Sequence, residues 1–154
     1  HSARNIYDQY VNFGAILDLA VGNRRLVRAI AYVITSEARD EVAFFDALAK
    51  FGIETREKEL QVFAGGAKKA DWDVGLAVDA IKLAPKLDAV VLVTGDGDFV
   101  PLVTYLQHMG IQVEVVTFGQ SASARLIETS DDFSDLSDNP KAYLMPSRKR
   151  PARA

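Results

Sequence analysis

The sequence is that of a folded protein of modest size. Its 154 residues are 49% hydrophobic and 25% charged, which is ordinary for a globular chain, and the length favours one domain with a sizeable core. No apolar run approaches the roughly 20 residues that cross a bilayer, so we expect no membrane partner. The sequence has no Cys, which excludes disulfides and thiolate zinc sites and fits a cytoplasmic location.

The net charge of −3 hides an uneven distribution. Residues 141–154 hold five basic groups and no acidic group, so the first 140 residues, with 13 basic and 21 acidic groups, carry −8. A body this acidic disfavours generic binding of nucleic acid, which depends on a basic surface. An RNA partner therefore requires bound cations, local basic groups or the tail, where Arg148, Lys149 and Arg150 are candidate contacts.

Apolar spacing predicts alternating helices and strands along the chain. We expect helices over residues 6–20, 38–51, 71–85, 98–109 and 122–128. We expect strands over residues 26–35, 53–60, 89–94 and 111–118, the second of them at a sheet edge. Residues 64–70 are expected to form a loop, 130–139 an acidic polar segment, and the chain beyond Pro140 a disordered basic tail. The alternation predicts an α/β fold with a three-layer parallel sheet.

The segment AVVLVTGDGDFVPL carries the first candidate site. Ligands of open parallel sheets bind beyond the carboxyl ends of the strands, and this predicted strand ends at Thr94. Asp96 and Asp98 follow on a tight, glycine-containing loop, where two carboxylates repel each other unless a cation lies between them. Oxygen ligands of this kind suit Mg²⁺ or Mn²⁺. The alternative is that one aspartate caps the next helix while the other is solvated.

A second acidic group lies upstream, in KKADWDVGLAVDAIKLA. Asp73 lies in the first turn of the predicted helix and can present its carboxylate over the strand ends. Asp79 lies six residues later on another face; orienting a neighbour and facing solvent both remain open for it. Lys69 is a candidate phosphate contact, although a solvated loop lysine is commoner. Trp72 is a candidate for base stacking, with packing as the simpler role.

The two segments together resemble the NYN domain, a branch of the PIN-like nuclease superfamily. Members carry a lysine-rich loop leading to Asp-Val and an apolar helix, followed by a strand that ends in Ser/Thr-Gly-Asp-x-Asp-Phe and later a glycine turn. The corresponding elements here are Lys69, Asp73-Val74, the run TGDGDF at residues 94–99, and Gly110. The resemblance covers residues 1–136, which we take as the domain, with residues 137–154 as the basic tail.

The resemblance implies a doubly wound parallel sheet in the order 3-2-1-4-5 and Mg²⁺- or Mn²⁺-dependent cleavage of RNA. Asp73, Asp96 and Asp98 would then be catalytic, metal-binding acids, with Thr94 supporting the loop. The family pattern also begins with a strand ending in Asp-x-x-Asn, and none precedes His1. We therefore expect a further strand and a fourth acid upstream of the sequence given. The oligomeric state stays open, with a homo-oligomer among the alternatives.

Two other functions compete with the nuclease. Asp96-Gly97-Asp98-Phe99-Val100 also resembles the Asp-x-Asp-x-Val/Thr signature of haloacid-dehalogenase phosphatases, in which the first Asp is a nucleophile directly after the first strand. Here the motif comes two-thirds of the way along the chain. The second alternative is a non-catalytic RNA-binding or regulatory NYN module that uses the basic tail as a contact.

Overall fold

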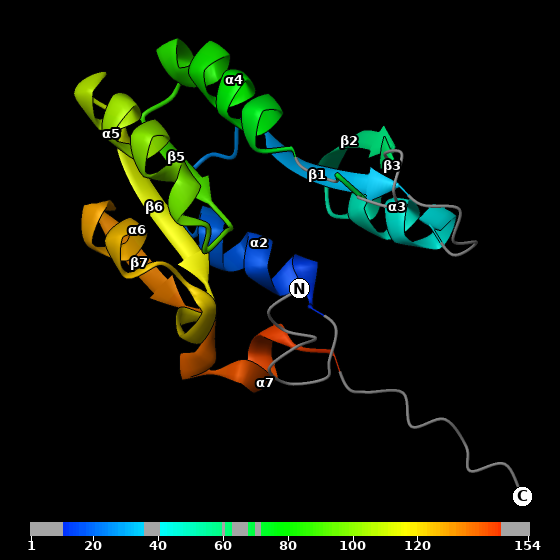
Figure 1. Ribbon diagram of the computed structural model, residues 1–154. Helices are drawn as coiled ribbons and strands as arrows, with labels where there is room; N and C mark the ends of the chain where they lie inside the picture. The colour runs from blue at the N-terminus through cyan, green and yellow to red at the C-terminus, as the bar shows by residue number, and fades with distance from the viewer. Residues whose placement is uncertain (1–10, 36–40, 60, 63–67, 70–71, 146–154) are drawn as a thin grey trace, which may run out of the picture.

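The computed structural model describes residues 11–35, 41–59, 61–62, 68–69 and 72–145 (Figure 1). The first helix is α2 (Phe13–Val21), which follows the side-chain cap of Asn12; its Oδ1 accepts a hydrogen bond from the Ala15 amide. The predicted start of this helix, residues 6–10, lies outside the described residues.

The first parallel sheet consists of β1 (Ala29–Thr35) and β2 (Ile53–Glu59), joined through α3 (Glu41–Lys50). The strands pair in parallel over their full length, with Ala29 opposite Ile53 and Thr35 opposite Glu59. Both strands were expected. A short antiparallel hairpin follows, β3 (Gln61–Val62) with β4 (Lys68–Lys69). Part of it falls in a predicted loop, because two-residue strands are too short for a periodic pattern.

The second sheet holds three parallel strands in the order β5 (Ala89–Leu92), β6 (Gln112–Thr117) and β7 (Asp132–Asp135). Before β5 come α4 (Asp73–Leu83) and the 3-10 turn η1 (Ala84–Lys86). After it come η2 (Gly97–Phe99), α5 (Val100–His108), η3 (Gly119–Ser121) and α6 (Ala124–Thr129). The sequence analysis missed β7, because DFSD holds a single apolar residue and shows no strand alternation.

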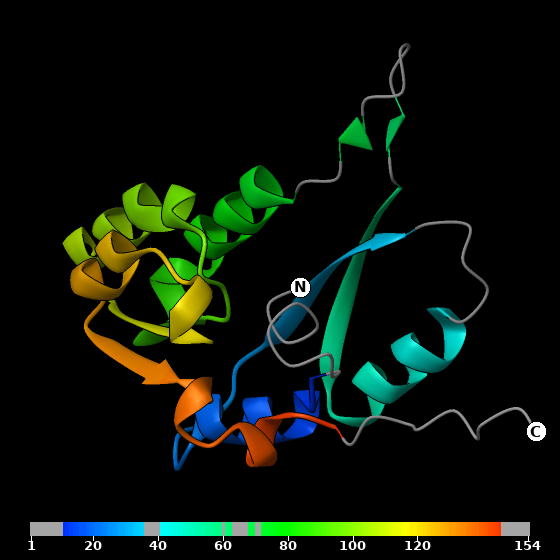
Figure 2. The ribbon, with the colours of Figure 1, turned by 60° about the horizontal axis from the view of Figure 1, so that its bottom comes forward.

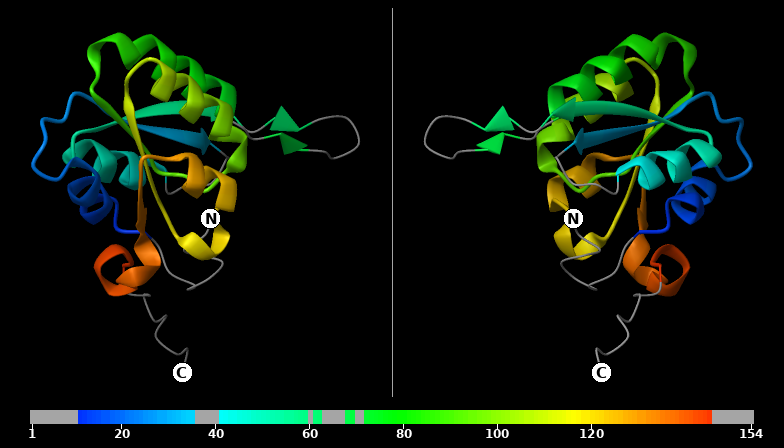
Figure 3. Two further views of the ribbon diagram at one scale, coloured as in Figure 1. Left: turned by 90° about the vertical axis from the view of Figure 1, so that its left-hand side faces the viewer. Right: turned by 90° about the vertical axis from the view of Figure 1, so that its right-hand side faces the viewer.

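The two sheets are separate in the part of the chain that the structure describes. β1 pairs with β2 and β5 pairs with β6, but no described strand joins β1 to β5, and Figure 2 shows the two strand groups apart. Helices α4 and α5 lie on one side of the strands, and α2 and α3 lie on the other (Figure 3). The α/β class with parallel sheets is thus confirmed, whereas the single sheet in the order 3-2-1-4-5 stays a prediction.

The core lies around β5 and β6. Leu106 of α5, Leu126 of α6, and Val113 and Val115 of β6 are all fully buried in one cluster. The apolar side of α4 packs against the same cluster with partly buried residues, namely Leu76, Ala77 and Ala80. Helix α4 therefore packs on the second sheet through apolar contacts.

The C-terminal part of the domain extends further than the sequence suggested. Beyond β7 lie η4 (Leu136–Asp138) and α7 (Pro140–Tyr143). Buried Leu144 joins a second core cluster with Ile16, and the Asn12 amide donates to the Tyr143 carbonyl at 2.8 Å. These contacts correct the expectation that order ends near Pro140. Residues 146–154, including the candidate contacts Arg148, Lys149 and Arg150, lie outside the described residues.

No helix among the described residues is long and apolar enough to cross a membrane.

Core packing around α5 gives a first prediction. Leu106 is fully buried, so Leu106→Ala removes apolar contacts and leaves a cavity, and we expect the free energy of unfolding to fall by about 3 kcal/mol in urea titration. Met109, at the end of the same helix, is 52% exposed, so Met109→Ala should change it by less than about 0.5 kcal/mol. Equal effects of the two substitutions would contradict this description of the core.

Candidate metal centre

The loop that carries Asp96 and Asp98 begins where β5 ends and leads into η2. The Asp96 amide donates to Thr94 Oγ1 at 3.2 Å, and the Asp98 amide donates to Asp96 Oδ1 at 2.9 Å. The Thr94 side chain thus accepts a hydrogen bond from the loop backbone, and its supporting role in a site stays a prediction. Asp96 does act as a cap for η2, as the simpler alternative proposed, but a carboxylate that accepts one such bond still has lone pairs to offer.

Two glycines let this loop pass close to the segment before α6. A Cβ on Gly95 would lie 3.0 Å from Ala122 Cα, and a Cβ on Gly97 would lie 2.8 Å from Ser123 Oγ. The Ser123 amide also donates to the Gly95 carbonyl at 2.9 Å. The glycines therefore allow a close approach that fixes the loop against a neighbouring element.

Asp73 reaches the same place from another part of the fold. It is the first residue of α4, whereas the other two acids follow β5. One carboxylate oxygen from each of Asp73, Asp96 and Asp98 lies within 4.8 Å of the other two. Asp73 is partly buried, and Asp96 and Asp98 are exposed. The structure thus brings together the three residues that the sequence singled out.

The donor set fits a hard divalent cation. Three carboxylates supply oxygen ligands only, which is the preference of Mg²⁺ and Mn²⁺, and both ions retain waters or bind substrate phosphates at their remaining positions. Like charges this close destabilise one another unless a positive group lies nearby. The exposed position of Asp96 and Asp98 leaves the cluster open to a substrate from solvent.

Asp79 does not belong to this cluster and instead ties α4 to the first sheet. Its Oδ2 accepts a hydrogen bond from the Tyr32 hydroxyl at 2.8 Å and lies 2.9 Å from Arg56 Nε. Burial and the Asp79 carboxylate together raise the pKa of Tyr32 to about 12. The sequence left open whether Asp79 orients a neighbour or faces solvent. Its contacts with Tyr32 and Arg56 show that its carboxylate is bound by neighbouring side chains.

Trp72 packs and does not offer a free ring. Its Nε1 donates to the Val33 carbonyl at 3.0 Å, and its ring meets Tyr32 edge-on at 5.6 Å. Lys58 Nζ lies 5.6 Å from the centre of the ring. Lys69 belongs to β4, and its side chain lies outside the description.

Tyr32 and Arg56 were not predicted as part of any site. The available signal was that Tyr32 is the one aromatic side chain, with a hydroxyl at its tip, in the largely apolar run AIAYVIT. A buried tyrosine hydroxyl usually has a partner, but the sequence does not say which.

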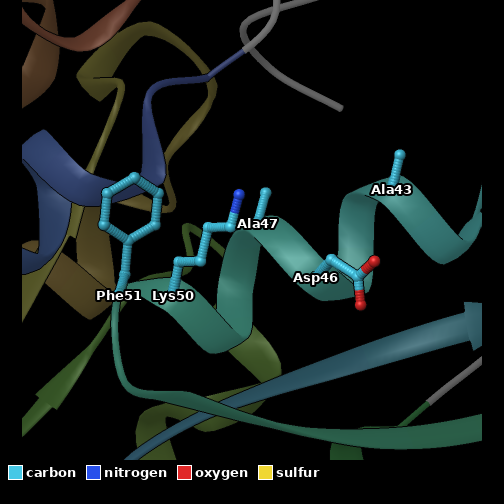
Figure 4. A pocket seen from close by; sticks show the side chains of 5 residues that line it. All are labelled: Ala43, Asp46, Ala47, Lys50 and Phe51. Atoms are coloured by element: carbon cyan, nitrogen blue, oxygen red, sulfur yellow. The ribbon is translucent and has the colours of Figure 1, made fainter.

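A hollow of about 360 Å³ lies along α3, lined by Ala43, Asp46, Ala47, Lys50 and Phe51 (Figure 4). None of these residues is one of the three clustered acids or their supports.

Comparisons with known proteins agree with this arrangement. The profile of the family described as NYN domain matches residues 2–137. The low amplitude and bright protein LabA of Synechococcus elongatus is 28% identical over 119 residues, which are 73% of this chain and 64% of LabA. The chain therefore matches less than two thirds of that relative's length. The chain is also similar to a protein of unknown function from Vibrio parahaemolyticus, whose crystal structure is known. The two sequences are 32% identical, the match covers 94% of this chain and 88% of the Vibrio chain, and the structures superpose with a TM-score of 0.84.

The contact between Tyr32 and Asp79 predicts a titration. Asp79→Asn removes the carboxylate that disfavours the phenolate, so the pKa of Tyr32 should fall from about 12 towards its ordinary value of 10. Absorbance of phenolate near 295 nm, with Tyr32→Phe subtracted, measures this shift. An unchanged Tyr32 titration in the Asp79→Asn protein would contradict the contact.

The raised pKa of Tyr32 also determines how the free energy of unfolding changes with pH. Between pH 10 and about 12 the folded protein keeps the Tyr32 proton that the unfolded chain loses, so the free energy of unfolding falls as pH rises through this window. Below pH 10 the contribution is fully present.

Proposed function

The chain belongs to the NYN domain family, and from this premise we propose that it is a metal-dependent ribonuclease that hydrolyses RNA phosphodiester bonds. The observation that carries the proposal is the convergence of Asp73, Asp96 and Asp98 within 4.8 Å. These acids come from two distant segments of the sequence, and both segments carry the family's motif. A cation bound among the three carboxylates would offset their negative charge and account for their convergence at one place.

In the proposed mechanism the carboxylates of the three aspartates would hold the cation and offset its positive charge. A bound Mg²⁺ or Mn²⁺ supplies Lewis-acid activation of water and stabilises negative charge on phosphate oxygens. The bond from the Asp98 amide keeps Asp96 in a fixed orientation, and Thr94 holds the backbone at the loop's start. None of the aspartates needs to accept the proton of the attacking water for this chemistry.

We also propose that the two parallel sheets are halves of one sheet in the order 3-2-1-4-5. In the described residues β1 and β5 each pair on one side only, and unpaired backbone groups at two such edges are costly. A parallel strand between them supplies those partners. If this strand ends at the same edge of the sheet as β5, it would place there the fourth acid that the family pattern includes.

Substrate contacts in this proposal come from basic groups, since the body of the protein is acidic. Lys69 is placed close in sequence to Asp73, and Arg148, Lys149 and Arg150 lie in the basic tail. These residues are proposed contacts for the RNA backbone, where lysine and arginine bind phosphates. We place this activity in the cytoplasm, in accord with the absence of cysteine.

A regulatory or RNA-binding module is the second candidate. The name of LabA records no enzymatic activity, and two of the three clustered acids are exposed, where their mutual repulsion is screened by solvent. Binding of RNA without any Mn²⁺-dependent cleavage would favour this candidate. The phosphatase alternative is weaker, because β1 and β2 precede β5 whereas its nucleophile follows the first strand of the domain.

The decisive variant for the nuclease is Asp96→Asn. It keeps the shape of the side chain but removes a charged ligand, so we expect Mn²⁺-dependent cleavage of labelled single-stranded RNA to fall by more than the roughly 10- to 100-fold that an outer-shell loss costs. Asp88→Asn is the matched control, since Asp88 is an exposed aspartate outside the cluster, and should leave cleavage unchanged. Full activity of Asp96→Asn would refute the assignment.

A further inference from the structure

From the contacts around the start of α4 we propose that Trp72 is a positioning residue, which holds Asp73 at the metal site by fastening the first turn of α4 to β1. The inference rests on the proposed metal centre and adds to it a residue that itself binds neither metal nor substrate. It also gives Trp72 a function beyond filling space.

The first turn of α4 receives no side-chain cap from its N-cap residue, Trp72, and a helix start without such a cap frays more readily. Asp73 is the next residue, so fraying there moves its carboxylate directly. A contact that fastens this turn to a neighbouring element therefore bears on where the Asp73 carboxylate lies.

The indole of Trp72 supplies that contact. Its Nε1 donates to the Val33 carbonyl of β1 at 3.0 Å, and its ring packs edge-on against Tyr32 of the same strand. The third contact is with α4 itself, because the ring lies so close to Gly75 that a Cβ there would be 2.5 Å from Trp72 Cε3. The ring is thus enclosed between β1 and the first turn of α4.

The two halves of the acidic cluster are held by different parts of the fold. Asp96 and Asp98 are fixed by Thr94 and by the approach of Ser123 to the loop. Asp73 is fixed through α4, which the Trp72 contact joins to the first sheet. A disturbance at Trp72 should therefore displace Asp73 and leave the Asp96 loop intact.

Gly75→Ala tests this directly, since the new methyl group forces the Trp72 ring out of its place. The chain offers a matched control in Gly14 of α2, where a Cβ would lie 2.6 Å from Phe51 Cε1. Each substitution adds a methyl group to a helical glycine against which an aromatic ring packs, so both should lower the melting temperature. Only Gly75→Ala touches the turn that carries Asp73.

The measurement is the Kd for Mn²⁺, from the electron paramagnetic resonance signal of free Mn²⁺ in titrations of the 154-residue protein. We expect Gly75→Ala and Trp72→Phe, which keeps a ring but loses the bond to Val33, each to weaken binding about 10-fold. Gly14→Ala should bind as the wild type does. Circular dichroism confirms that each variant is folded at the temperature used.

Trp72 is the single tryptophan of the sequence, so its fluorescence gives a second readout. Mn²⁺ bound beside Asp73 should quench the emission of the wild-type protein, and Asp73→Asn should abolish that quenching. If the wild type binds Mn²⁺ and both Trp72→Phe and Gly75→Ala bind it equally well, the positioning role is wrong while the metal centre stands. If the wild type binds no Mn²⁺, the metal centre fails and the positioning role fails with it.

Discussion

The convergence of three carboxylates is the constraint on which the proposed function depends. One carboxylate oxygen from each of Asp73, Asp96 and Asp98 lies within 4.8 Å of the other two, and like charges at such a separation repel each other, although solvent screens the exposed ones. Their approach is imposed by the backbone: one acid begins α4, and the other two follow β5 through a loop that two glycines allow to pack closely. A divalent cation held among the three carboxylates would offset their charge.

Helix α4 contacts both sheets of the molecule. Its apolar side packs on the cluster around β5 and β6 through Leu76, Ala77 and Ala80. Its polar contacts go to the first sheet, where Trp72 binds the Val33 carbonyl and Asp79 meets Tyr32 and Arg56. Helix α4 thus contacts two sheets that share no hydrogen-bonded strand in the described residues, and it carries one of the three acids.

Much of this was predictable from the sequence, for reasons that differ between elements. The apolar run at residues 89–94 is short, continuous and followed by a glycine-containing acidic loop, so the strand and the position of Asp96 and Asp98 after its end could be predicted together. The convergence of Asp73 with them came from matching two motifs of one family, because spacing alone does not say how a helix lies over a sheet.

Other features left no local signal. The strand β7 has the sequence DFSD, and it forms because its backbone pairs with β6, which is a tertiary effect that residue patterns do not record. The same holds for α7, where Leu144 is buried by contacts with the start of the domain. The link from Asp79 to Tyr32 and Arg56 joins residues far apart in sequence, so their polarity was visible but their pairing was not.

The most direct test of the metal centre is a crystal structure of this protein grown with Mn²⁺, with anomalous diffraction used to locate the ion. The account predicts an anomalous peak among the carboxylates of Asp73, Asp96 and Asp98, with oxygen distances of roughly 2.0–2.3 Å. Density that shows Asp73 turned away from the other two acids, with no ion between them, would contradict it.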